Sequence, residues 1–121
     1  MERLRHQFAD GRPQFLELWV ETEDGQSMCA LVNGGAGWLM YLREECDAGF
    51  SSRAPDYRGS PDTVREYYLD NGQRDEYPAS WTLPVDEVER ALEHFITHAQ
   101  PAPWIVWHND SGDGVAIGCA I

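Results

Sequence analysis

Alternating apolar and polar side chains predict a strand near the amino terminus. In residues 14–21 an apolar row alternates with a mixed row: Leu16, Leu18 and Val20 against Phe15, Glu17, Trp19 and Glu21. The pair Asp24-Gly25 is typical of a turn, and residues 28–32 form a second apolar run. We therefore expect the two segments to pair as an antiparallel hairpin.

A third strand is predicted at residues 37–43, after a glycine-rich turn at residues 33–37. Both of its faces are apolar, which is typical of a central strand. Residues 44–62 are polar and contain several Gly and Pro residues, so a loop is expected there, with Phe50 as the only hint of a short strand. Residues 64–69 and 73–77 flank Asp70-Asn71-Gly72, and Asn-Gly favours a type I′ hairpin turn.

One amphipathic helix is predicted at residues 84–98. Pro84 suits its first turn, Asp86 and Glu87 complement the positive end of the helix dipole, and Pro101 follows its end. Its apolar positions fall on one stripe: Val85, Val88, Leu92, Phe95 and Ile96. A last strand is expected at residues 104–108.

The elements together predict an α+β fold, an antiparallel β-sheet of about five to six strands packed against one main amphipathic helix. The length of 121 residues fits a single domain, with residues 1–12 and 109–121 as tail segments that could be flexible. Within the second tail, Val115, Ala116, Ile117 and Ile121 could form an edge strand or contact a partner.

The charge balance narrows the classes of partner. With 21 acidic and 9 basic residues the formal net charge is −12, so binding of nucleic acid or of a membrane through a basic patch is disfavoured. A cationic partner would be attracted, although the charge could also serve solubility alone. Three cysteines do not form a disulfide framework, and neither a signal peptide nor a membrane span is evident, which favours the cytoplasm.

Candidate catalytic chemistry is sparse. The glycines at residues 33–37 are not followed by a helix pattern or a lysine, so a hairpin turn is favoured over a phosphate cradle. His94 and His98 could reach one metal ion, but the His-Glu-x-x-His order is missing. No serine or cysteine lies in a known nucleophile motif, Cys29 is expected in the core, and the five tryptophans are expected mainly to fill the core. The sequence thus predicts a binding protein without cofactor, metal or catalytic residues.

Acidic clusters beside aromatic residues are the candidate contact surface. Residues 21–24, 44–47 and 75–77 fall at or beside predicted strand ends, where loops can converge on one side of a sheet. Solvation of the surface is the alternative interpretation. The residues expected to contact a partner are Glu44, Glu45, Asp47, Tyr57, Asp75, Glu76 and Tyr77.

Several short motifs resemble the Imm1 immunity-protein family. They are Tyr67-Tyr68-Leu69-Asp70-Asn71-Gly72, Leu83-Pro84-Val85, Ala91-Leu92-Glu93-His94-Phe95 and Pro101-Ala102-Pro103-Trp104-Ile105-Val106-Trp107. The segment Gly37-Trp38-Leu39-Met40-Tyr41-Leu42 is similar to the family's strand that leads from a glycine turn to a tyrosine. The order and the spacing of the motifs agree, and the resemblance spans roughly residues 15–107.

The resemblance implies a cytoplasmic protein that binds and neutralises a cognate secreted toxin by occluding its active site. It implies a basic toxin that acts on nucleic acid, of the deaminase or nuclease type. Two alternatives stay open at this point. An aromatic-rich pocket between sheet and helix would favour a small-molecule-binding accessory or self-resistance protein of a biosynthetic cluster. A cleft that holds His94 or His108 beside a buried carboxylate would favour an enzyme.

Overall fold

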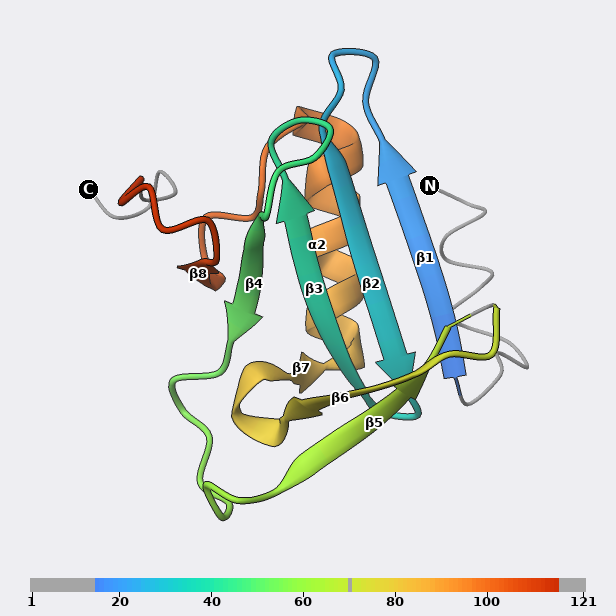
Figure 1. Ribbon diagram of the computed structural model, residues 1–121, viewed down its shortest axis with the longest axis vertical. Helices are drawn as coiled ribbons and strands as arrows, with labels where there is room; N and C mark the ends of the chain where they lie inside the picture. The colour runs from blue at the N-terminus through green and yellow to red at the C-terminus, as the bar shows by residue number, and fades with distance from the viewer. Residues whose placement is uncertain (1–14, 70, 116–121) are drawn as a thin grey trace.

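The computed structural model describes residues 15–69 and 71–115, and these form a central antiparallel sheet with a layer on each face (Figure 1). The strand order is β1-β2-β3-β4-β8, and the short strand β7 pairs with the start of β3. This arrangement confirms the predicted α+β class with six strands and one main helix. The sheet strands are β1 (Phe15–Glu21), β2 (Ser27–Asn33), β3 (Ala36–Leu42), β4 (Phe50–Arg53), β7 (Leu83–Pro84) and β8 (Val106–Asn109).

The helix α2 (Val85–His98) covers one face of the sheet, behind the strands in Figure 1. Its buried stripe packs against the alternate residues of β2 and β3 that point to this side, because period-two and period-3.6 patterns each place their apolar side chains on one face. The members of this core with no exposed surface are Met28, Ala30, Val32, Leu39, Val88, Ala91, Leu92, Phe95 and Ala102. Ile96, which was expected on the same stripe, is 40% exposed.

Both ends of α2 are fixed by backbone geometry. Pro84 is the last residue of β7 and pairs with Ala36 of β3, so the helix begins at the next residue, Val85. The N–H of Val85 donates to the Gly35 carbonyl at 2.8 Å. At the other end Ala99 adopts the left-handed conformation with φ +54°, and its N–H donates to the Phe95 carbonyl. The short β2–β3 turn is thereby tied directly to the start of the helix.

The second hairpin, β5 (Val64–Tyr68) and β6 (Arg74–Pro78), crosses the opposite face of the sheet (Figure 1). Tyr67 is fully buried there, and the ring of Tyr77 stacks on Trp38 at 4.2 Å between centroids. The short 3-10 helix η1 (Ala79–Trp81) follows it and leads into β7. Strands β2 and β3 are consequently buried on both faces, as the two apolar faces of residues 37–43 predicted.

The structure corrects the expected loop at residues 44–62, because Phe50–Arg53 form β4 between β3 and β8. The polar residues of this strand wrongly suggested a solvent-exposed loop, because its serines are buried and have hydrogen-bond partners. The hydroxyl of Ser52 donates to the Trp81 carbonyl at 2.9 Å and accepts from the Leu39 N–H at 3.1 Å. The hydroxyl of Ser51 donates to Asp110 at 2.8 Å.

Three smaller expectations were also wrong. In the β5–β6 turn only Gly72 has a positive φ among the described residues, and its N–H donates to the Leu69 carbonyl, so the turn is not type I′. The last strand begins at Val106 instead of residue 104. Trp19 and Trp104 are 48% and 44% exposed and do not fill the core, whereas Cys29 is buried as expected.

The close approach of α2 to β3 at Gly37 predicts a steric effect of substitution. A Cβ at this position would lie 2.7 Å from Cγ2 of Val88 and 3.2 Å from the Leu31 carbonyl oxygen, whereas a Cβ at Gly35 meets nothing within 4 Å. We expect Gly37→Ala to lower the free energy of unfolding by about 1–3 kcal/mol, since a buried neighbour must move. Urea unfolding measures the change, and Gly35→Ala is the matched control. Equal stability of the two variants would contradict the packing.

Candidate partner-binding surface

One end of the sheet gathers most of the acidic loops. The β1–β2 turn and the β3–β4 loop lie side by side there, because Ser27 pairs with Leu42 and the Tyr41 hydroxyl donates to Gln26 at 2.7 Å (Figure 1). The segment after β8 joins them, since the Asp110 N–H donates to the Gly49 carbonyl. We call this region the acidic end; its eight carboxylates are Glu21, Glu23, Asp24, Glu44, Glu45, Asp47, Asp110 and Asp113.

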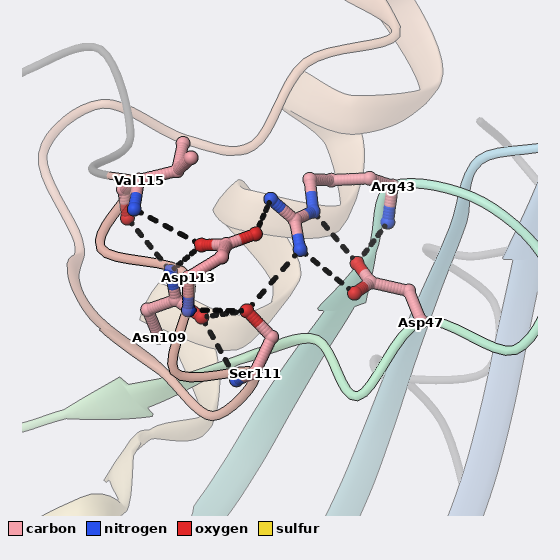
Figure 2. Close-up of polar contacts among 6 residues, drawn as sticks. All are labelled: Arg43, Asp47, Asn109, Ser111, Asp113 and Val115. Carbon is pink, nitrogen blue, oxygen red and sulfur yellow. Dashed lines mark hydrogen bonds and ion pairs between the residues drawn. The ribbon is translucent and has the colours of Figure 1, made fainter.

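Arg43 joins the β3–β4 loop to the segment after β8 (Figure 2). Its Nε and Nη2 donate to the two carboxylate oxygens of Asp47, each at 2.9 Å, and its Nη1 lies 2.8 Å from Oδ2 of Asp113. The Arg43 backbone N–H also donates to Asp47 at 3.0 Å. A bidentate guanidinium–carboxylate pair has fixed geometry, so the loop and the segment hold each other in place.

The segment from Asn109 to Val115 is folded by its own side chains, as Figure 2 shows. The Asn109 amide donates to Asp113 at 2.6 Å and to the Val115 carbonyl at 2.9 Å. Its carbonyl oxygen accepts from the N–H and the hydroxyl of Ser111. These residues were predicted as the start of a tail that could be flexible; residues 116–121, with Ala116, Ile117 and Ile121, lie outside the described residues.

Hydrogen bonds keep several carboxylates of the acidic end ionised. The Arg43 guanidinium holds the pKa of Asp47 well below its usual range, and hydrogen bonds from Val115, Asn109 and Arg43 do the same for the pKa of Asp113. In the β1–β2 turn, hydrogen bonds from Thr22 and Gln26 lower the pKa of Asp24. These three carboxylates therefore lose their negative charge at a lower pH than ordinary carboxyl groups do.

The predicted contact residues are divided among three places. Glu44 and Glu45 are exposed in the β3–β4 loop, while the Asp47 side chain beside them is only 6% exposed because Arg43 covers it. Asp75, Glu76 and Tyr77 belong to β6 on the face opposite α2. Tyr57 lies in the β4–β5 connection, where its hydroxyl donates to the Ser60 carbonyl. The structure thus does not bring all seven residues onto one surface.

On β6 the side chains alternate between the sheet and solvent. Glu76 is exposed and pairs with Arg74, which also contacts Glu66, each at 2.8 Å. The Tyr77 ring is engaged by Trp38, and burial raises the pKa of Tyr77 to about 12. Its hydroxyl donates to Asp75 at 3.3 Å. Much of this acidic cluster is therefore committed to interactions within the hairpin.

Tyr57 lines an open groove of about 470 Å³ at the edge of the sheet, beside Arg53, Pro84, Trp104 and Val106. The space between sheet and helix, where the small-molecule alternative places an aromatic-rich pocket, is filled by the buried core. The edge groove borders that space, because its lining also includes Glu87 of α2 and the core residues Leu83 and Ile105.

The histidines do not show the arrangement that the enzyme alternative requires. His108 lies 2.8 Å from Asp110, but the two side chains are 56% and 34% exposed, so this carboxylate is not buried. His94 contacts the rings of His98 and Trp104. No group of three or more His, Cys, Asp or Glu side chains suited to a metal ion occurs among the residues that the structure describes.

Arg43, Asp110 and Asp113 were missed as parts of the surface. The polar run from Asn109 to Gly114 was interpreted as a tail, and its alternation of short polar residues with glycines was the available signal of a turn held by side-chain hydrogen bonds. Its pairing with Arg43 links positions about 70 residues apart, which local patterns do not reveal.

Together the fold and its surface define a small α+β protein with an acidic end. Within the described residues, no helix has the length and the apolar character that a membrane span requires. The sequence matches the family model described as Immunity protein Imm1 over residues 3–109. The chain therefore belongs to the Imm1 immunity-protein family, as its motifs suggested. No match was found among curated proteins.

The contacts of Arg43 predict a stability effect that depends on pH. The folded pKa values of Asp47 and Asp113 lie below the value of about 3.9 that an unfolded chain has, so their contribution to stability is present above that value and is lost as the pH falls through the folded pKa values. Arg43→Met should thus lower the free energy of unfolding more at pH 7 than at pH 3.

Urea unfolding at the two pH values measures this difference. Arg90→Met is a suitable control, because the pair of Arg90 with Glu87 is exposed on α2 and should contribute little. An Arg43→Met effect of the same size at pH 7 and pH 3 would show that packing of the side chain, and not its ion pairs, stabilises the protein.

Proposed function

We propose that this Imm1 protein acts in the cytoplasm by binding a cognate basic toxin that works on nucleic acid, of the deaminase or nuclease type, and by covering its active site. The observation that carries the proposal is the acidic end, where eight carboxylates meet on three segments of an Imm1 family member. A cleft that binds nucleic acid is lined by basic side chains, so a surface of this kind can compete with the phosphate backbone. Such inhibition needs no catalytic step.

The rigidity of the acidic end supports this role. Bringing carboxylates together costs free energy through their mutual repulsion, and the pairs of Arg43 with Asp47 and Asp113 offset part of it. A surface already arranged in the free protein loses less conformational entropy on binding. Glu44 and Glu45 are exposed and are the proposed contacts of the β3–β4 loop, while Asp47 holds the loop in place.

The β6 cluster and Tyr57 form separate candidate contacts. The hairpin that crosses the other face of the sheet carries Asp75, Glu76 and Tyr77. A single partner would need a large contact surface to reach these residues and the acidic end together. Their participation stays part of the proposal and is tested separately by Glu76→Lys, because Glu76 is the exposed member of the three.

A second candidate function is the binding of a small molecule in the groove of about 470 Å³ beside Tyr57 and Trp104. This volume falls within the range of pockets that hold drug-sized ligands. If this function applies, a thermal-shift screen should find compounds that raise the melting temperature of the wild-type protein and not of Trp104→Ala. A screen without stabilising compounds would count against it.

Binding to the carboxyl-terminal domain of the protein encoded by the adjacent gene, which the proposal expects to be the cognate toxin, tests the leading proposal. Calorimetry at low and moderate salt should show tight one-to-one binding that weakens as salt rises, and the complex should have no toxin activity. Wild-type protein that neither binds nor inhibits that domain would contradict the proposal.

Charge reversal tests the role of the acidic end in association. We expect the double variant Glu44→Lys/Glu45→Lys to lower the association rate constant by about ten-fold at low salt, because steering toward a basic cleft is weakened. The matched control is Asp56→Lys/Asp62→Lys, which makes the same change of charge in the exposed β4–β5 connection. Equal association rates for the two variants would remove the acidic end from the mechanism.

A further inference from the structure

A groove of about 450 Å³ lies between the β1–β2 turn and the last turn of α2, within the acidic end. Apolar groups line part of it: Val20 from β1, and Phe95 and Ile96 from α2. Ile96 is 40% exposed, whereas Val88, Leu92 and Phe95 of the same helix are fully buried. The groove thus offers an open apolar surface in the most acidic part of the protein.

Negative charge surrounds this apolar surface. Glu21, Glu23 and Asp24 line the groove on the side of the β1–β2 turn. On the other side it includes Ala99, the residue that ends α2, and the carboxyl end of a helix carries a partial negative charge. His94 and His98 lie about half a turn around the helix from Ile96, and their rings contact each other while His94 also contacts Trp104, so they face away from the groove.

The carboxylate of Asp24 is held in position. The side-chain amide of Gln26 donates to both of its oxygens, each at 3.1 Å, and the Thr22 hydroxyl donates to one of them. The Thr22 N–H donates to the Gln26 carbonyl at 2.9 Å and closes the turn. The turn therefore holds the Asp24 carboxylate in a fixed position without a partner bound.

We propose that this groove receives a basic side chain, arginine or lysine, from the toxin. Such a side chain has an apolar stem and a cationic head, and the groove has apolar groups for the stem and carboxylates with a helix carboxyl end for the head. This inference rests on the proposed function and adds the place and the chemistry of one anchoring contact. Anchors that fill pockets control dissociation, whereas charges at the rim mainly control association.

The test uses surface plasmon resonance to compare the dissociation rates of complexes with the domain from the adjacent gene that the proposed function expects to be the toxin, in a catalytically inactive form. The double variant Glu21→Lys/Glu23→Lys should dissociate about ten-fold faster than wild type, because a buried charge contact is replaced by repulsion. Asp24 is left unchanged because its carboxylate accepts hydrogen bonds from Thr22 and Gln26 within the turn. The control Glu44→Lys/Glu45→Lys changes charge by the same amount at the acidic end but outside the groove, and it should alter mainly association.

A second variant tests the apolar part without a change of charge. Ile96→Ala should also speed dissociation, by about five-fold, while its association rate and its salt dependence stay as in wild type, because only contact with the stem is lost. Ile96 is partly exposed, so folding should persist, and circular dichroism verifies this. If Ile96→Ala does not fold, Ile96→Val replaces it, and this variant should show a smaller increase in the dissociation rate.

The outcomes separate this inference from the proposed function. If wild-type protein does not bind the toxin domain, the proposed function fails and the inference fails with it. If wild type binds but both groove variants dissociate at the wild-type rate, only the inference is overturned. If two-dimensional NMR of this protein alone shows that the chemical shifts of the groove residues change with protein concentration, a second copy occupies the groove and the inference is likewise overturned.

Discussion

Burial of β2 and β3 on both faces governs the rest of the structure. Their odd and even side chains meet different layers, α2 on one side and the β5–β6 hairpin on the other, so neither strand can shift its register by one residue without exposing a core face. Gly37 lets α2 approach the start of β3, and the stack of Tyr77 on Trp38 fixes the hairpin over the same end of the strand. Both covering elements therefore anchor near the β2–β3 turn.

The other end of the sheet is consequently where connecting segments lie open to solvent. Their composition is acidic, and Arg43 supplies the internal counter-charge that holds two of them together. This ion pair is partly exposed, so its contribution to stability is modest, and its main effect is on the geometry of the loops. Under the proposed function, binding uses a surface that the core positions and the ion pairs arrange, in keeping with the general rule that binding residues lie on loops supported by a rigid scaffold.

Patterns along the chain predicted much of the fold. The first hairpin, the central β3, the second hairpin and α2 follow from local periodicity and turn residues, which report directly on which side chains share a face. Strand β4 was missed because Ser51 and Ser52 are polar, and their burial depends on hydrogen-bond partners from the segment after β8, from η1 and from β3. The exposure of Trp19 and Trp104 was missed because residue type alone does not determine burial at an edge of a sheet.

The candidate surface was predicted less completely than the fold. Acidic clusters are visible in a sequence, but their grouping is a tertiary property: residues 21–24 and 44–47 meet at one end, while residues 75–77 lie on the hairpin. Arg43 and Asp113 could not be linked before the β4–β8 pairing was known. The family, by contrast, was recognised from short motifs, because their order and spacing along the chain need no tertiary knowledge.

Hydrogen exchange of the backbone amides, with and without the toxin domain, tests most directly whether the acidic end is the binding surface. The account predicts added protection in the β1–β2 turn, the β3–β4 loop and residues 109–115. Added protection confined to the hairpin, with the three acidic segments unchanged, would contradict it.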